Sequence, residues 1–308
     1  MLKRFYLLFF TLTLLSNATS FDIIFNLSKA LSTLYKESSN KINYPDFKVD
    51  NNNSKKVIYL TFDDGPTRGT QKLIKFLEQE GVKATMFCVG KHIQKRRAIF
   101  EREKRIKNLL IANHTYSHAD EHYKRFYSRF YDVLRDIEHS QSIIGGRKFL
   151  RLAGRNVWRL PEIKRDDYGL PKAQRAGEVK DYDKLAKDGY YIFGWDVDWS
   201  YDYKNGKMLH TAKELKAKIK YFQKKGWYRK EGKIVLLAHD FMFKNDKDIN
   251  QLKEFIKIMR EDGWSFETLE DYCSLKPKPL IFPKYYQYNK SGLAKELISD
   301  LIYKFFTK

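Results

Sequence analysis

The sequence predicts an α/β fold in which parallel strands and helices alternate and curl into a distorted (β/α)7-type barrel. Short apolar runs typical of buried parallel strands recur along the chain, namely Val57–Phe62, Ala84–Val89, Leu109–Ala112, Phe149–Ala153, Tyr191–Val197 and Ile234–Ala238. Between most of them lie stretches with helical spacing of apolar residues, namely Thr70–Glu80, His122–Ile144, Thr211–Lys225 and Ile249–Asp262. About seven such units in succession favour a closed or distorted barrel over an open doubly wound sheet.

Glycines mark where three of these helices should end. Gly81, Gly226 and Gly263 each follow a predicted helix. Helices often end on a glycine because it adopts a positive φ without steric cost. The polar, basic segment Val157–Asp183 breaks the alternation, so we expect it to form an inserted loop beside the functional site.

The N-terminus has the pattern of an export signal. Lys3 and Arg4 precede the apolar run Phe5–Leu15, and Ala18-Thr19-Ser20 follows as a small-residue cleavage site. The apolar run is short for a membrane span, which needs about 20 residues. We therefore expect a signal peptide over residues 1–20 and a periplasmic or secreted protein. An uncleaved anchor is the alternative.

Two further segments flank the main domain, which we place at residues 55–275. Residues 21–54 resemble a helical leader followed by a polar linker. Residues 276–308 form an extension whose apolar residues recur at helical spacing between lysines. Such a helix packs on its own domain or lies on a membrane surface, and both alternatives stay open.

Composition restricts the class of partner. The chain of 308 residues has a formal net charge of +21, which favours anionic surroundings. The basic residues are dispersed and form no known nucleic-acid-binding module, so we expect no nucleic-acid partner. The two cysteines, Cys88 and Cys273, are too few for a disulfide scaffold, and whether they pair stays open.

Metal-binding side chains follow two predicted strands. Asp63 and Asp64 end the first strand, and His114 and His118 follow the third. Histidines four residues apart lie on one face of a helical turn, where both could bind one ion. An aspartate and two histidines leave a position for water, whose pKa a bound metal lowers. Taken singly, a solvated Asp-Gly turn and a solvated histidine pair are equally good interpretations.

Other strand ends also carry polar residues. Arg151 follows an apolar run and requires a carboxylate partner unless it extends to the surface. Asp196 and Asp198 alternate with tryptophans, which places the two acids on one side of a regular strand. His239 ends the last strand and is a candidate acid or base, or else a structural histidine. In a parallel barrel these strand ends meet at one face.

The blocks Thr61-Phe62-Asp63-Asp64-Gly65 and His114-Thr115-Tyr116-Ser117-His118, followed by the polar strand ends at Arg151, Asp198 and His239, resemble a known family. It is the polysaccharide deacetylase family, also called carbohydrate esterase family four, which is defined by the NodB homology domain. The likeness covers residues 56–272. It implies a distorted β/α barrel and a metal-dependent hydrolase that cleaves the linear amides of N-acetylated amino sugars.

The resemblance also implies a role for each matching residue. Asp63 would be the general base, Arg151 the cation that holds it, His239 the general acid and Asp198 the carboxylate that orients His239. Asp64, His114 and His118 would bind one divalent ion, with zinc as the first choice and cobalt, nickel or manganese as alternatives. Trp199 and Leu237 would line the acetyl pocket, and the Gly154 N–H would help to bind the oxyanion. The family often has Pro at position 153 and an aromatic residue at position 154, where this chain has Ala and Gly.

The expected substrate is an N-acetylated glycan of the cell envelope, either a polymer or a lipid-linked amino sugar. The net positive charge of the chain favours an anionic substrate among these. Peripheral membrane contact through the C-terminal helix is a further expectation, and the oligomeric state stays open. Two alternatives remain, an O-acetyl esterase acting on a polysaccharide and a catalytically weak glycan-binding module of the same fold.

Overall fold

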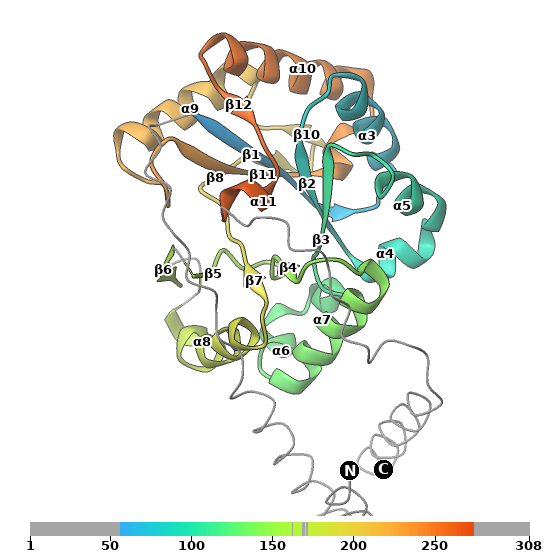
Figure 1. Cartoon of the computed structure of the whole chain (residues 1–308), viewed down its shortest axis with the longest axis vertical. Helices are drawn as coiled ribbons and strands as arrows, with labels where there is room; N and C mark the ends of the chain where they lie inside the picture. Colours follow the sequence, from blue (N-terminus) through green and yellow to red (C-terminus); the bar gives the residue numbers. More distant parts are fainter. Residues whose placement is uncertain (1–55, 162, 168–169, 171, 274–308) are drawn as a thin grey trace, which may run out of the picture.

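The computed structural model describes residues 56–161, 163–167, 170 and 172–273 (Figure 1). The predicted signal peptide, leader and C-terminal extension lie outside these residues. Within the described part of the chain, no helix is long and apolar enough to cross a membrane. Cys88 and Cys273 are both buried and do not form a disulfide with each other.

A curled, mostly parallel sheet forms the centre of the fold. Its parallel strands are β1 (Val57–Gly65), β2 (Ala84–Cys88), β3 (Leu109–Asn113), β4 (Phe149–Leu150), β7 (Tyr191–Ile192), β8 (Val197–Asp198), β11 (Lys233–His239) and β12 (Ser265–Phe266). The order is β6-β5-β7-β4-β3-β2-β1-β11-β8, with β12 also paired to β1. β7 and β8 lie far apart in this order although only residues 193–196 connect them. The sheet is therefore an incompletely closed barrel, which confirms the predicted fold class.

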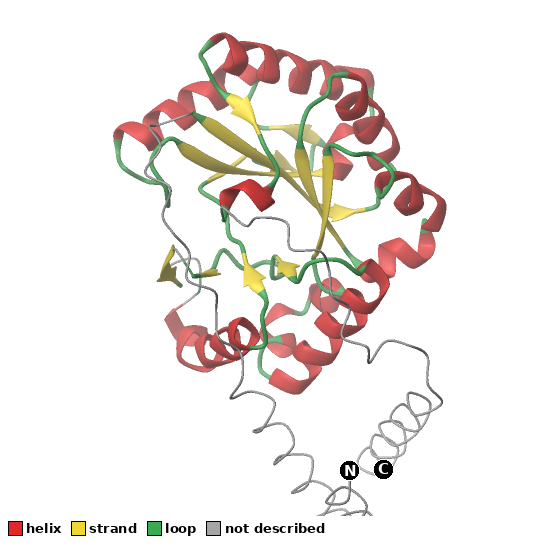
Figure 2. Ribbon diagram, viewed as in Figure 1, coloured by secondary structure: helices red, strands yellow, loops and turns green. Residues whose placement is uncertain are grey.

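Helices cover the outside of the sheet (Figure 2). They are α3 (Thr70–Gln79), α4 (Gly90–Lys95), α5 (Arg97–Glu103), α6 (Tyr123–Phe126), α7 (Phe130–Ile144), α8 (Lys172–Lys187), α9 (Ala212–Lys224) and α10 (Asp246–Glu261). The short helix α11 (Leu269–Tyr272) instead packs inside the curl of the sheet. Gly81, Gly226 and Gly263 have φ values of 60°, 68° and 81°, which confirms them at the helix ends. Two short 3-10 turns, η1 (His118–Glu121) and η2 (Asp240–Phe243), follow strand ends at the predicted site.

Alternation along β1 separates two hydrophobic cores. Ile58, Leu60 and Phe62 are fully buried in the core outside the sheet, which α3, α9 and α10 complete. Val57 and Tyr59 belong to a second core inside the curl. Each buried side chain of this size contributes about 1.5–3 kcal/mol.

The polar insert differs from the prediction. Instead of a loop, it contains β5 (Trp158–Leu160), β6 (Ile163–Asp166) and α8. Arg155 and Glu178 form a buried ion pair, with 2.8 Å between Nε and Oε2, that ties α8 to the barrel. The charged sequence of α8 shows no clear apolar stripe, so periodicity did not reveal it.

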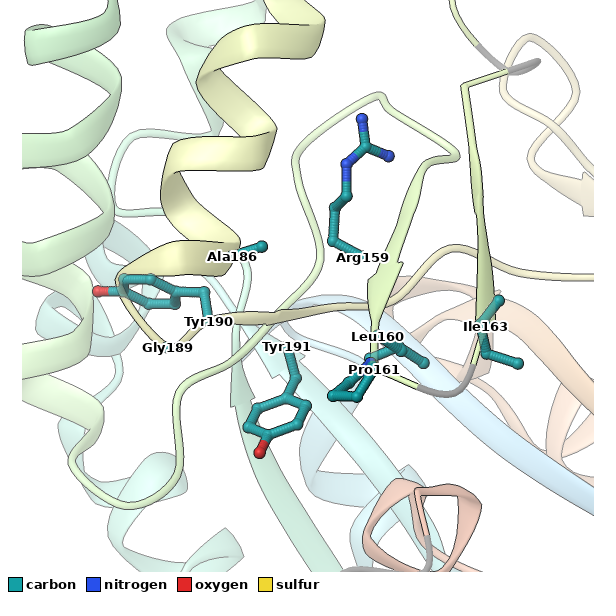
Figure 3. A pocket seen from close by; sticks show the side chains of 8 residues that line it. All are labelled: Arg159, Leu160, Pro161, Ile163, Ala186, Gly189, Tyr190 and Tyr191. Atoms are coloured by element: carbon teal, nitrogen blue, oxygen red, sulfur yellow. The ribbon is translucent and has the colours of Figure 1, made fainter. Parts of the chain in front are cut away.

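A cavity of about 400 Å³ lies between α8, the β5–β6 hairpin and β7 (Figure 3). Leu160, Pro161, Ile163 and Tyr191 supply its apolar lining. Tyr191 is the first residue of β7, so the cavity lies near the end of the sheet at which the parallel strands begin. The predicted site lies at the other end, where the strands finish. None of the predicted site residues lines the cavity.

Candidate active site

A distortion at the end of β1 brings two adjacent aspartates to one place. Neighbouring side chains of a regular strand point to opposite faces. Here the pairing of β1 with β2 shifts register between Phe62 and Gly65, and Asp64 has a φ of 73°. Asp63 Oδ2 and Asp64 Oδ1 consequently lie 3.6 and 3.5 Å from Nε2 of His114. Bulges of this kind re-aim side chains next to active sites.

His114 and His118 are brought together by a loop rather than by the predicted helical turn. Thr115 and His118 have φ values of 67° and 54°, in the left-handed region. Asn113 Oδ1 accepts the Thr115 N–H at 2.8 Å, and Asp136 on α7 accepts the Tyr116 N–H at 2.7 Å. These bonds hold the loop, and the two imidazole centroids lie 5.1 Å apart.

The three predicted metal ligands converge. Asp64 Oδ1 lies 3.1 Å from Nε2 of His118 as well as close to His114. Nδ1 of His114 lies 2.8 Å from the Arg151 carbonyl, and Nδ1 of His118 lies 2.6 Å from Glu121. Since a carbonyl or carboxylate oxygen accepts, each Nδ1 donates, and the Nε2 atoms of both rings face Asp64. Once both rings are neutral at Nε2, these two nitrogens and the carboxylate oxygen fit a shared cation.

The separations also fit a metal. Donor atoms at about 2.0–2.1 Å from a tetrahedral ion lie about 3.3 Å apart. The ligand atoms of Asp64, His114 and His118 all lie within 4.8 Å of one another. Burial opposes ionisation of Asp64, but its contacts with the imidazoles of His114 and His118 hold its pKa well below the usual range. Burial likewise opposes the charged form of His118, yet Asp64 and Glu121 raise its pKa to about 9.

Arg151 is completely buried and pairs with Asp63. Its Nη1 lies 2.7 Å from Asp63 Oδ1 and donates also to Thr61 Oγ1 at 2.7 Å. Its Nη2 donates to the Gly194 carbonyl at 2.8 Å. Burial lowers the pKa of Arg151, although the Asp63 carboxylate opposes this shift. A guanidinium with several bonds in place holds one carboxylate rigidly.

His239 lies beside Asp63. The two are register partners at the ends of β11 and β1, and neighbouring strands are about 4.8 Å apart. Leu237 is the register partner of Thr61 and is 6% exposed. It therefore lies on the side of the sheet that carries Asp63, as an acetyl-pocket residue would.

The predicted contact between Asp198 and His239 is not formed. Asp198 Oδ1 lies 2.9 Å from Lys218 Nζ on α9, and Ser200 donates to Oδ2 at 2.5 Å. Burial opposes ionisation of Asp198, but these two bonds lower its pKa. Nδ1 of His239 is buried and has no hydrogen-bond partner among the described residues. Asp198 therefore belongs to the contact between β8 and α9.

Trp199 also differs from its predicted place. It is 1% exposed and packs between Phe243 and Phe255, with ring centroids 5.9 and 5.4 Å away. Its indole N–H donates to the His210 carbonyl at 2.9 Å. The residue is thus part of the outer core and offers no surface to a substrate. β8 ends at Asp198, one residue before Trp199. The alternation of side chains along this segment places Val197 and Trp199 in the core outside the sheet.

Gly154 keeps its predicted place near the site. Its φ is 63°, and an added Cβ would lie 2.8 Å from the Tyr123 ring. Tyr123 in turn donates to Glu121 at 2.8 Å and contacts His118 edge to face at 5.8 Å. Glu121 and Tyr123 were not among the residues predicted from the sequence. Their spacing from His118 was the available signal, but it indicated only a polar turn.

Comparison with known families supports this site. The polysaccharide deacetylase family model matches residues 50–177, which contain the aspartate pair, the histidine pair and Arg151. Over these residues the chain is similar to the polysaccharide deacetylase family. His239 lies beyond the matched residues and joins the site through the fold.

Two curated proteins with deacetylase names are similar to this chain over most of its length. A peptidoglycan-N-acetylglucosamine deacetylase of Bacillus cereus is 24% identical over 221 residues, with 72% of each chain covered. A chitin disaccharide deacetylase of Vibrio alginolyticus is 23% identical, with 71% of this chain and 72% of the relative covered.

Two solved structures show the same fold. The catalytic domain of a peptidoglycan N-acetylglucosamine deacetylase from Eubacterium rectale has a TM-score of 0.54 at 22% identity, covering 73% of this chain and 93% of its own. A Streptococcus mutans esterase of carbohydrate esterase family four has a TM-score of 0.51 at 19% identity, covering 70% and 87%. Both similarities are similarities of the fold.

Proposed function

We propose that this chain is a metal-dependent hydrolase that removes N-acetyl groups from an amino-sugar polymer or a lipid-linked amino sugar of the cell envelope. The observation that carries the proposal is the buried Asp63–Arg151 pair beside the convergent donors of Asp64, His114 and His118. The named activities of the relatives, on peptidoglycan N-acetylglucosamine and chitin disaccharide, support the substrate class.

Asp64, His114 and His118 would hold one divalent ion, with zinc favoured because two imidazoles and a carboxylate suit it. Cobalt, nickel and manganese are the alternatives. When bound, the ion supplies positive charge that polarises the amide carbonyl and acidifies water. The chain's own residues do the rest of the chemistry.

Hydrolysis of the amide requires two proton transfers. Asp63, oriented by Arg151, accepts a proton from the attacking water, whose oxygen forms a bond to the acetyl carbon. His239, across from Asp63, gives a proton to the sugar nitrogen as the C–N bond breaks. The products are acetate and a free amine. A base and an acid held in different surroundings can perform these opposite roles at one pH.

Leu237 and Gly154 complete the proposed site. Leu237 would contact the acetyl methyl group, since it is buried on the same side of the sheet as Asp63. The Gly154 N–H would donate to the developing oxyanion, as preorganised backbone donors do in other hydrolases.

The test is an assay of a panel of N-acetylated oligosaccharides, including a lipid-linked one, for acetate and free amine with and without chelator. The proposal predicts equal amounts of acetate and amine, lost with chelator and restored by zinc. Acetate without amine, from O-acetylated xylan, would indicate an O-acetyl esterase. Glycan binding that persists without any acetate release, and is unchanged in Asp63→Asn, would indicate a binding module.

Export is part of the proposal and rests on the pattern of residues 1–20. N-terminal sequencing of the mature protein from a cell-envelope fraction should give a start after Ser20. A start at Met1 would instead support the anchor. Deletion of residues 290–308 should lower membrane association if the C-terminal extension touches lipid.

A further inference from the structure

Two exposed aromatic side chains lie together where α9 ends and the chain turns toward β11 (Figure 1). Tyr221 and Trp227 are 50% and 51% exposed, and their ring centroids lie 5.7 Å apart. Phe222, half-buried against the outer core, lies 5.3 Å from Trp227. We call Tyr221, Trp227 and the adjacent Lys224 and Lys225 the α9 corner. Clustered exposed apolar groups, unlike scattered ones, mark interaction surfaces.

The end of the helix fixes Trp227 at the surface. Gly226 has a φ of 68° and follows α9, and the Trp227 N–H donates to the Phe222 carbonyl at 2.9 Å. A contact between this position and the last helical turn commonly accompanies such a helix end. Here the Trp227 and Phe222 rings meet at 90°, and half of the Trp227 side chain stays exposed. A ring ordered in advance loses little conformational entropy when a partner binds.

The α9 corner is strongly basic. Residues 220–230 contain five lysines and arginines and no acidic residue. Lys224 and Lys225 form no ion pair with any carboxylate that the structure describes, and the Lys225 ammonium lies 5.6 Å from the Tyr221 ring centroid. Two unpaired cations beside two exposed rings suit a partner that is both anionic and partly apolar.

The geometry of the rings favours a lipid surface over a sugar chain. The Tyr221 and Trp227 rings stand at 85° to each other, so they provide no flat platform on which a pyranose could stack. Tryptophan and tyrosine beside lysine are instead typical of the boundary between lipid headgroups and hydrocarbon. At that boundary the rings enter the interface while ammonium groups contact anionic headgroups.

The α9 corner lies at the end of the barrel where the parallel strands begin. The loop that carries Trp227 leads into β11, and the Val57 N–H at the start of β1 donates to the Gly232 carbonyl in that loop at 2.8 Å. The residues that precede β1, including the apolar run Phe5–Leu15, therefore join the barrel beside this corner. β11 is seven residues long, so His239 at its other end lies roughly 20 Å away.

We propose that the α9 corner docks the protein on an anionic membrane surface, with Tyr221 and Trp227 at the level of the headgroups and Lys224 and Lys225 against lipid phosphates. This contact is separate from the C-terminal extension and does not depend on the proposed deacetylase activity. It orients the barrel so that the strand ends carrying the candidate site face away from the bilayer. The site is then directed toward glycan strands that lie outside the membrane.

The first test measures binding of the full metal-loaded chain to vesicles of phosphatidylglycerol mixed with phosphatidylcholine. Changing Lys224→Gln together with Lys225→Gln should lower the partition coefficient in co-sedimentation about 30-fold, since each lysine near an anionic surface adds attraction. Pure phosphatidylcholine vesicles should bind wild type and variant equally weakly. No binding of the wild type to the anionic vesicles would overturn the proposal.

The matched control changes Lys124→Gln together with Arg125→Gln. These are also adjacent exposed cations, but they lie on α6, beside the ring of Tyr123 that contacts His118 at the other end of the barrel. Partitioning should stay within about threefold of the wild type, because charges farther than a Debye length from the bilayer are screened. An equal loss in both double variants would reduce the effect to net charge and contradict docking by the α9 corner.

Tryptophan fluorescence separates this contact from binding by residues 1–20 or the C-terminal extension, which contain no tryptophan. Apart from Trp227, the tryptophans are buried or half-buried. Phosphatidylglycerol brominated on its acyl chains should quench the wild type on binding. Trp227→Phe keeps an apolar ring, so it should bind nearly as well and lose most of the quenching. Quenching that Trp227→Phe retains in full would show that another surface contacts lipid.

Soluble poly(glycerol phosphate) distinguishes a lipid surface from an anionic wall polymer. If the wild type binds this polymer but no vesicles, and the Lys224 and Lys225 double variant loses that binding, the membrane assignment is wrong. Vesicle binding with bromolipid quenching that depends on Trp227 supports it.

Discussion

Replacing Arg151 with methionine removes the cation that holds Asp63 while keeping much of the side-chain volume. The Arg151 and Asp63 side chains are 0% and 4% exposed. After the change, Asp63 is a buried carboxylate without its cation, and the Gly194 carbonyl loses a donor at 2.8 Å. Breaking a buried ion pair on one side costs about 3–5 kcal/mol. Methionine preserves apolar contact with Phe87, over which the guanidinium lies at 4.2 Å.

We therefore expect Arg151→Met to lower the free energy of unfolding by about 4 kcal/mol. The assay is urea denaturation followed by tryptophan fluorescence, in chelator so that metal binding does not contribute. The double variant Arg151→Met with Asp63→Asn removes the uncompensated charge and should recover about 2 kcal/mol. The reasoning would be refuted if the free energy of unfolding of Arg151→Met lay within about 1 kcal/mol of the wild-type value. It would also be refuted if the double variant recovered none of the lost free energy.

Three further predictions concern other residues. Burial raises the pKa of Asp196 to about 7. Between pH 5 and pH 7 the folded state therefore holds a proton on this carboxyl that the unfolded state has already released, since its pKa is near 4. The free energy of unfolding should consequently fall by about 2 kcal/mol from pH 5 to pH 7. Asp196→Asn should flatten that fall in urea titrations, and an unchanged slope would contradict it. Gly154→Ala should cost about 1–2 kcal/mol by thermal denaturation, because φ is 63° and the new Cβ meets Tyr123 at 2.8 Å. Asp198→Asn should leave the pH profile of kcat unchanged and cost at most about 1 kcal/mol, since it weakens only the half-exposed bonds with Lys218 and Ser200. A shifted profile would restore its predicted role.

The long buried strands of the barrel could be predicted from the sequence, and the short ones could not. β1, β2 and β11 coincide with continuous apolar runs, because both of their faces are covered. β4 contains only Phe149–Leu150, and the predicted strand Tyr191–Val197 divides into β7 and β8. The curvature of the sheet decides where these strands stop pairing, and that depends on neighbours distant in sequence.

The identity of the converging side chains was predictable, but the way they converge was not. The spacing of His114 and His118 predicted a helical turn, whereas Asp136, distant in sequence, holds them in a left-handed loop. Adjacent aspartates should point apart, yet the bulge at Asp64 lets both reach His114. The partner of Asp198 is Lys218, whose proximity follows from the packing of α9 on β8.

Metal stoichiometry tests most directly whether Asp64, His114 and His118 bind one divalent ion. Stripped protein reloaded with zinc and desalted should contain one ion per chain by elemental analysis. His118→Ala should contain none, whereas His139→Ala, whose ring stacks on Tyr116 at 4.1 Å, should still contain one. A folded His118→Ala variant that keeps a full equivalent of zinc would contradict the account.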